Sequence, residues 1–380
     1  MTKKVKAEAL VGVTKMETEL SEEIPKKRFL ISGTMRGGSS LVSNILNAHS
    51  NVLALGEYIH FFRFLYREAD PPNVESFAQK LEEMRLRLFY RYNLQFESDR
   101  VLADVRDKGV SYQNLYDAVL RYFLEQAGKE IGGEDAALNW TTIPEYLRLF
   151  PDGKVIQIIR DPRAVLASWH KSSYHETKYL DAIFNCIDNM EKCLTYQKIL
   201  SQDNYMFVRY EDVITQPEET ARKFCEFIGI EFEPLMIHPE RWDELFDGVL
   251  VKRGWSSFTG SMKNKGFDKS RMNAWEKNLD DWELCLCEML TGERLTKFDY
   301  DFSEKKFSHT EINKSVEILR QDSFLVSRYM KWFLTNEGSE GYPEDPTDPF
   351  SWGGSEDYKK RFVDTKKGKE YLSKMAKLQE

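Results

Sequence analysis

Apolar residues follow two patterns along the chain: short uninterrupted runs, and longer stretches in which they recur every three or four positions. The runs at 28–33, 154–160 and 205–210 are typical of buried strands in a parallel sheet. The spaced pattern predicts helices over 39–49, 74–92, 111–127, 179–200, 310–334 and 357–378, and between a cap at Thr215 and Gly229. Because strands alternate with helices, we expect an α/β fold with a mainly parallel central sheet flanked by helices.

The same pattern divides the chain into three parts. Residues 1–27 are polar, lack the apolar core of a secretory leader, and are expected to form a flexible N-terminal tail. Residues 28–306 hold the alternating strands and helices and are expected to form one domain, and residues 307–380 a helical C-terminal extension. This extension could pack on the body, cover the site or mediate a homodimer.

Composition narrows the classes of partner. The formal charge of −8 argues against nucleic acid as a partner. No apolar run approaches the ~18 residues of a membrane span, so no membrane partner is expected. The five cysteines show no C-x-x-C spacing, which predicts reduced thiols in a cytoplasmic protein and no metal site.

The candidate chemistry begins at ISGTMRGGSSL, residues 31–41, between the first strand and the first helix. Gly33, Gly38 and Ser40 fit the G-x-x-x-x-G-x-[ST] spacing of a phosphate-binding P-loop. Ser39 stands where a nucleotide-hydrolysing loop has its lysine, and Arg36 lies inside the loop. Backbone N–H groups before a helix favour an anion, so this P-loop-like turn suits one compact phosphate. A turn that only packs strand against helix is the alternative.

A second anion site is predicted at IIRDPRAVLASW, residues 158–169. Arg160 ends a buried strand, and Ser168 follows eight residues later on the next helix. An arginine fork and a hydroxyl that converge in this way can hold a second phosphate. In the alternative interpretation, Arg163 forms a surface ion pair and Arg160 only caps the end of the sheet. Together, the two sites predict a ligand with two separate phosphate groups.

Three segments together resemble the PAPS-dependent sulfotransferases. RGGSSL (36–41) is similar to the loop that binds the 5′-phosphosulfate in this family, and IIRDPRAVLASW is similar to its 3′-phosphate motif. FVRYEDVITQPEETARKFCEFIGI (207–230) is similar to the segment that precedes a C-terminal helix. The resemblance covers about residues 28–302 and points to the bacterial and carbohydrate or tyrosyl-type branch more than to the cytosolic phenol and steroid branch. It implies PAPS as the sulfuryl donor, PAP as the product and no required metal.

The resemblance also implies which residues contact this cofactor. The loop would hold the 5′ end, Arg160 and Ser168 the 3′-phosphate, and Tyr210 the nucleotide. The late segment WSSF (255–258), followed by a tryptophan, is similar to the loop that closes over the cofactor. The expected cofactor-binding residues are Arg36, Gly37, Gly38, Ser39, Ser40, Arg160, Ser168, Tyr210, Ser257, Lys269 and Arg271.

Two departures from the family pattern concern the catalytic centre. Asp135 stands where many relatives carry a lysine, and Ala274 stands where they carry a basic residue before the late tryptophan. Lys269 or Arg271 could replace the second of these. The departures keep open a degenerate protein that binds the nucleotide without turning it over.

The expected catalytic residues are Arg36, Glu57 and His60. Arg36 would stabilise the charge that grows on the leaving phosphate. Glu57, in LGEYIHFF (55–62), lies where carbohydrate- and tyrosyl-type relatives use a glutamate as the general base, and His60 is the second choice. A solvated loop acid is the alternative for Glu57.

Three functions therefore compete: a sulfotransferase, a P-loop nucleotide kinase and a nucleotide-binding protein without activity. The missing lysine and the pair formed by Arg160 and Ser168 argue against the kinase. The sulfotransferase is favoured, with transfer to a hydroxyl or amine of a small-molecule or carbohydrate acceptor.

Overall fold

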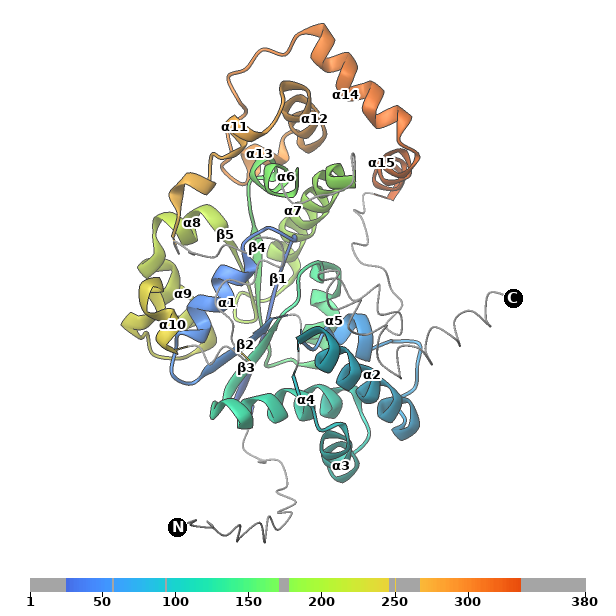
Figure 1. Cartoon of the computed structure of the whole chain (residues 1–380), viewed down its shortest axis with the longest axis vertical. Helices are drawn as coiled ribbons and strands as arrows, with labels where there is room; N and C mark the ends of the chain where they lie inside the picture. The colour runs from blue at the N-terminus through green and yellow to red at the C-terminus, as the bar shows by residue number, and fades with distance from the viewer. Residues whose placement is uncertain are drawn as a thin grey trace, which may run out of the picture.

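The computed structural model describes residues 25–56, 58–92, 94–170, 178–245, 250 and 267–335. Its centre is a five-stranded sheet of order β2-β3-β1-β4-β5, in which all neighbouring strands run parallel (Figure 1). The strands are β1 (Lys27–Gly33), β2 (Val52–Gly56), β3 (Ile131–Asp135), β4 (Lys154–Ile159) and β5 (Tyr205–Arg209). The predicted α/β fold with a parallel central sheet is confirmed.

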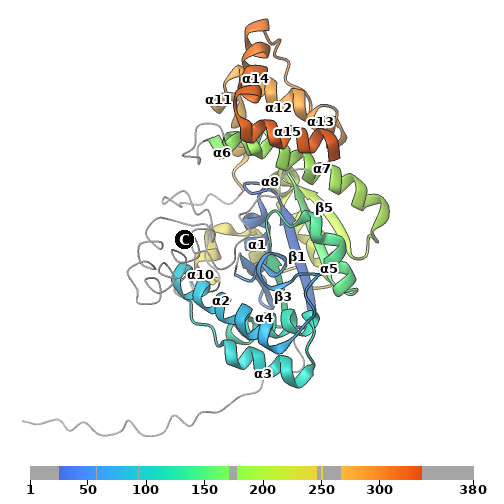
Figure 2. The same cartoon turned by 90° about the vertical axis from the view of Figure 1, so that its right-hand side faces the viewer.

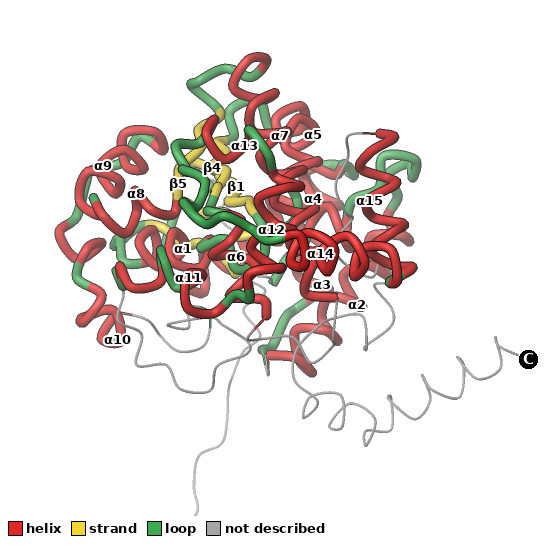
Figure 3. The backbone as a smooth tube through the Cα atoms, turned by 90° about the horizontal axis from the view of Figure 1, so that it is seen from above, coloured by secondary structure: helices red, strands yellow, loops and turns green. Residues whose placement is uncertain are grey.

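Helices cover both faces of this sheet (Figure 3). The α-helices are α1 (Ser39–Asn47), α2 (Val74–Tyr92), α3 (Ser98–Lys108), α4 (Tyr112–Ala127), α5 (Ile143–Leu149), α6 (Pro162–His170), α7 (Asp181–Ile199), α8 (Tyr210–Thr215), α9 (Pro217–Ile228), α10 (Trp242–Leu245), α11 (Trp275–Asn278), α12 (Asp281–Thr291), α13 (Arg294–Lys297), α14 (His309–Gln321) and α15 (Ser323–Thr335). The short 3₁₀ or π turns are η1 (Phe61–Leu65), η2 (Trp140–Thr142), η3 (Lys178–Leu180), η4 (Pro234–Ile237), η5 (Pro239–Arg241) and η6 (Lys269–Arg271).

Alternate residues of each central strand enter different cores, because successive side chains point to opposite faces. Leu30 and Val155 pack with residues of α2, α4 and α5. Ile31 and Ile156 pack with residues of α1, α8 and α9. Burial on both faces explains why β1 and β4 read as uninterrupted apolar runs in the sequence.

The carboxyl ends of all five strands lie at one edge of the sheet. β1 and β4 are neighbours there, with Gly33 paired to Ile158. The chain leaves β1 towards β2 on one side and later enters β4 on the other side. Ligands of open α/β sheets bind at such a switch point, outside the carboxyl ends of the strands. The predicted loop and Arg160 follow these two strand ends directly.

The sequence pattern did not predict β2 and β3. β3 has the sequence IGGED, with two glycines and two acids, and it therefore lacks an apolar run. Its glycines are needed for close packing: a Cβ at Gly133 would lie 2.2 Å from the carbonyl oxygen of Phe29 on β1 and 2.3 Å from its ring. The neighbouring strand can approach only because position 133 has no side chain.

Two helix predictions need correction. Thr215 does not cap α9; it ends α8, its hydroxyl donates to the carbonyl of Glu211, and Gln216 occupies the N-cap. The single helix expected over 310–334 is divided into α14 and α15, because Asp322 adopts an extended conformation at the end of α14. The segment 357–378 lies outside the described residues.

Helices α11 to α15 gather at one end of the molecule, next to α6 and α7 (Figures 1 and 2). They share an apolar core in which Leu286 of α12 and Leu325 of α15 meet Val165 of α6 and Ile183 of α7. This core ties the C-terminal helices to the segment that follows β4. In the part of the chain that the structure describes, no helix is long and apolar enough to cross a membrane.

Candidate cofactor and active site

The loop after β1 adopts a conformation that depends on its glycines. Arg36 and Gly38 have positive φ angles of 65° and 106°, and Gly38 is the N-cap of α1. A Cβ at Gly38 would lie 2.3 Å from Cδ2 of Tyr210, because the tyrosine ring packs directly on the loop. The glycine therefore meets two requirements, the left-handed backbone and the contact with the residue after β5.

Three arginines from distant parts of the chain meet beside this loop; we call Arg36, Arg160 and Arg271 the arginine cluster. Arg36 Nε donates to Ser168 Oγ at 3.0 Å, which joins the loop to α6. Arg160 donates to the carbonyl oxygens of Arg36 at 2.7 Å and of Arg271 at 3.1 Å. Its guanidinium also lies 4.2 Å from the ring centroid of Tyr210. Five of the expected cofactor-binding residues are thus brought together.

The electrostatics of the arginine cluster favour a negatively charged ligand. Burial, and then the charges of Arg160 and Arg271, lower the pKa of Arg36 from its usual value. Arg160 is 9% exposed, and its buried Nε has no hydrogen-bond partner among the described residues. Like charges in a partly dry site repel one another, so an anion that pairs with them would be stabilised. The cluster is therefore suited to hold phosphate groups.

The first turn of α1 completes the predicted anion site. Ser39 is buried and Ser40 half-buried at its N-terminal end, where backbone N–H groups favour an anion. One turn later, Ser43 donates to Asp135 at the end of β3 at 3.0 Å. Sequence reasoning noted Asp135 only as a missing lysine. The structure instead shows it buried beside α1 and bonded to Ser43.

Four further expected site residues, Glu57, Ser257, His60 and Lys269, are not joined to the arginine cluster by the contacts given above. Glu57 and Ser257 lie outside the described residues. His60 is buried after the end of β2, and its ring lies edge-on to that of Phe64, with a centroid separation of 5.6 Å. Lys269 is exposed at the start of η6. These four positions stay predictions.

Glu134 is an ionisable residue that sequence reasoning missed. It is fully buried next to Phe61, whose backbone N–H donates to Oε1 at 3.2 Å. Arg87 is also buried nearby and donates to the carbonyls of Tyr58 and Ile59. Burial raises the pKa of Glu134 to about 7, against the opposing effects of these donors and of Arg87. The acidic composition of IGGED was the signal that an ionisable group lies at this strand end.

Glu134→Gln is expected to change the pH dependence of stability. An acid with a raised pKa in the folded state binds a proton more tightly there, so the parent loses stability as pH rises from about 4.5 to about 7. The glutamine cannot ionise, and it should make the protein more stable by at most about 3 kcal/mol above pH 7. Urea unfolding across this pH range measures the effect. Glu226→Gln, at an exposed position of α9, is the control, and a Glu134→Gln profile parallel to the parent profile would contradict the prediction.

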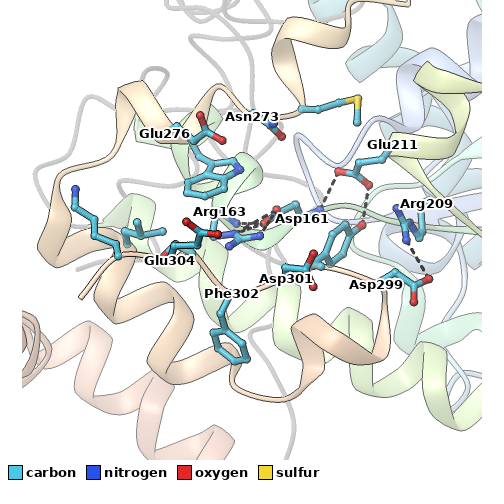
Figure 4. A pocket seen from close by; sticks show the side chains of 16 residues that line it. Asp161, Arg163, Arg209, Glu211, Asn273, Glu276, Asp299, Asp301, Phe302 and Glu304 are labelled. Atoms are coloured by element: carbon cyan, nitrogen blue, oxygen red, sulfur yellow. Dashed lines mark hydrogen bonds and ion pairs between the residues drawn. The ribbon is translucent and has the colours of Figure 1, made fainter. Parts of the chain in front are cut away.

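A cavity of about 580 Å³ is lined by residues at or just after the ends of β4 and β5 and by residues within 272–305 (Figure 4). Asp161 and Glu211, which directly follow Arg160 and Tyr210, line it together with Trp275. Polar and charged side chains dominate its lining. Within the described ranges, no group of three or more His, Cys, Asp or Glu side chains could hold a metal ion.

Comparison with known proteins shows which proteins this chain resembles. A family model described as "Sulfotransferase family" matches residues 28–234. The protein-tyrosine sulfotransferase of Drosophila melanogaster is 24% identical over 235 residues, which cover 59% of this chain and 42% of that protein. Human carbohydrate sulfotransferase 3 is 25% identical over 352 residues, which cover 78% of this chain and 71% of that protein. The first alignment thus spans less than half the length of the fly protein.

Two solved structures share the fold. The sulfotransferase domain of the Synechococcus PCC 7002 olefin synthase has a TM-score of 0.52 and 18% identity, and the match covers 75% of this chain and 99% of that domain. The sulfotransferase domain from the curacin biosynthetic pathway has a TM-score of 0.51 and 17% identity, with coverage of 73% and 99%. The predicted P-loop-like architecture is confirmed by these neighbours.

The predicted cytoplasmic location is wrong. The matched relatives are protein-tyrosine and carbohydrate sulfotransferases, the branch that contrasts with the cytosolic phenol and steroid enzymes. The prediction relied on the cysteines, but all five are free and buried, and burial raises the pKa of each thiol. Buried thiols are inert in any compartment, so their number does not indicate where the protein resides.

Proposed function

The chain belongs to the sulfotransferase family, and on this basis we propose that it transfers a sulfuryl group from PAPS to an acceptor hydroxyl. The acceptor would be a small molecule or a carbohydrate, and an amine is the alternative nucleophile. PAPS would lie across the carboxyl ends of β1, β4 and β5. Its 5′-phosphosulfate would contact the loop at 36–40, and its 3′-phosphate would contact Arg160 and Ser168.

The observation that carries this proposal is the contact between the two predicted phosphate sites. Arg36 of the loop donates to Ser168 of α6, and Arg160 donates to the carbonyl of Arg36. The two sites are therefore adjacent parts of one cationic surface, as a ligand with two phosphate groups on one nucleoside requires. A triphosphate–magnesium ligand would call for a lysine after Gly38, where Ser39 stands.

The residues of the cluster suit an in-line displacement at sulfur. In this step the acceptor oxygen forms a bond to sulfur while the bond from sulfur to the 5′-phosphate oxygen breaks. Arg36 and the N–H groups at the start of α1 would stabilise the negative charge that PAP gains. The acceptor proton would pass to a general base, for which Glu57 is proposed.

The relatives indicate the class of acceptor, and the sheet indicates the side from which the acceptor approaches. The matched proteins include a protein-tyrosine sulfotransferase and a carbohydrate sulfotransferase, which is consistent with a hydroxyl acceptor. Gly56, at the end of β2, pairs in register with Asp135 of β3, so position 57 directly follows a strand that ends at the same edge of the sheet as β1. We therefore propose that the acceptor approaches from the β2 and β3 side of the sheet.

Arg160→Ala is expected to remove most of the preference for PAP over adenosine 5′-monophosphate (AMP). The guanidinium pairs with the 3′-phosphate that AMP lacks, and such a charge-assisted contact contributes about 1.5–3 kcal/mol. Isothermal titration calorimetry with both nucleotides measures the preference in the parent and the variant. Arg222→Gln, which removes an exposed arginine paired with Glu218 on α9, is the matched control.

Equal affinity of the unmodified protein for PAP and AMP would contradict the assignment of Arg160. Transfer of label from ³⁵S-PAPS to a panel of carbohydrate and phenolic acceptors, with EDTA present, tests the activity itself. Tight PAP binding without transfer to any acceptor would favour the binding protein. ATP-dependent phosphorylation that stops on chelation would favour the kinase.

A further inference from the structure

Arg160 and Tyr210 lie just beyond the paired ends of β4 and β5, so contacts outside the sheet must fix their relative position. The ladder between β4 and β5 ends with the pair formed by Ile159 and Arg209. Arg160 and Tyr210 come immediately after this last pair, where no backbone ladder fixes their separation. Their mutual position matters, because the guanidinium of Arg160 lies over the ring of Tyr210.

The buried carboxylate of Glu211 provides such a contact, because it joins the residue after Tyr210 to the residue after Arg160. Oε1 of Glu211 accepts the backbone N–H of Asp161 at 3.2 Å, and Oε2 accepts the hydroxyl of Tyr300 at 2.7 Å (Figure 4). We call Asp161, Glu211 and Tyr300 the carboxylate clamp. All three residues are at most 6% exposed, so water competes little for these bonds. Arg160 and Tyr210 are thus held between the last ladder pair and the clamp.

Tyr300 is itself fixed from two sides. Its backbone N–H donates to the carbonyl of Leu295 at 3.0 Å. Arg209 of β5 donates to the carbonyl of Phe298 at 3.0 Å, and its guanidinium lies 5.1 Å from the centroid of the Tyr300 ring. The hydroxyl is therefore presented to Glu211 by a segment that is already anchored to β5.

We infer that Tyr300 is a positioning residue for recognition of the 3′-phosphate, acting through Glu211 on the guanidinium of Arg160. The inference rests on the proposed function, since it assumes a nucleotide with a 3′-phosphate. Tyr300 lies beyond residues 28–234, which the family model matches. The inference therefore assigns part of the cofactor site to the C-terminal half of the chain. It predicts a loss of selectivity rather than a general loss of nucleotide binding.

Tyr300→Phe tests this role because it removes one hydroxyl and keeps the ring. The full chain is titrated by calorimetry with PAP and with AMP. In the variant, the ratio of PAP affinity to AMP affinity should fall by about three- to tenfold, the size of one ordinary hydrogen bond, while AMP affinity stays nearly constant. The control is Tyr146→Phe, because Tyr146 is also fully buried and its hydroxyl has no hydrogen-bond partner in the part of the chain that the structure describes.

Substitutions of Glu211 provide a second test with the same readout. Glu211→Ala should lower the ratio of PAP affinity to AMP affinity at least as much as Tyr300→Phe. Glu211→Gln keeps an acceptor for the backbone N–H of Asp161, so this variant should retain more of the preference for PAP. An unchanged ratio in Tyr300→Phe, or a parallel fall in the affinities for both nucleotides, would overturn the inference. If the unmodified protein shows no preference for PAP, the proposed cofactor fails, and the role of Tyr300 fails with it.

Discussion

Arg36→Gln is expected to lower the rate of sulfuryl transfer by about 10²–10³-fold, the effect of removing one donor from a transition-state charge site. The guanidinium is half-buried near Arg160 and Arg271 and bonded to Ser168, so it is held in place before the reaction begins. Charge on the leaving phosphate grows as the bond to sulfur breaks, and it is greatest in the transition state. The substitution should therefore reduce kcat far more than it weakens PAP binding. Single-turnover kinetics with labelled PAPS, together with calorimetry, separates the two effects.

Arg36→Lys distinguishes charge from geometry. The lysine keeps a positive charge but cannot form the planar fork, and its restoration of activity should be partial. Arg222→Gln serves again as the control for the loss of one arginine. A proportional loss of kcat and PAP affinity in Arg36→Gln would show that Arg36 only binds the nucleotide.

Glu57→Gln should lower kcat by at least about a hundredfold, as expected when a general base is removed. Glutamine keeps the size and most of the hydrogen bonding of glutamate, but it cannot accept the acceptor proton at neutral pH. PAP affinity and folding should stay close to those of the parent, because β2, which precedes position 57 in the chain, is separated from β4 and β5 by β3 and β1 in the sheet. Steady-state transfer from PAPS with the best acceptor measures the change.

Glu68→Gln, at an exposed position shortly after η1, is the control for this substitution. Normal turnover in Glu57→Gln combined with loss of turnover in His60→Ala would move the role of base to the histidine. Normal turnover in both variants would point to an amine or an already acidic hydroxyl as the acceptor.

Much of the arginine cluster could be predicted from the sequence, because each of its parts has a local signature. The loop before α1 shows glycine spacing, and Arg160 ends an apolar run that continues into a helix. Their contact across 124 positions follows once β1 and β4 are neighbours. The parallel fold was predictable for the same reason, since strands buried on both faces are the easiest to recognise.

The parts that escaped prediction depend on long-range contacts. β3 lacks an apolar run because it packs through glycine against β1. The raised pKa of Glu134 arises from burial beside η1, which the residues around it in the sequence do not indicate. Tyr300 carries no local signal, because its partner Glu211 is 89 residues away.

The strand order has a consequence for how the chain folds as it is synthesised. β1 is the central strand of the sheet, but its partners β3 and β4 lie on the order of a hundred residues further along the chain. During synthesis, β1 therefore remains without its final neighbours until much of the chain has left the ribosome. Because Arg271 and Tyr300 follow later still, the nucleotide site is among the last features to form. A translation product truncated before these residues should contain the sheet strands but lack a complete pocket for the nucleotide.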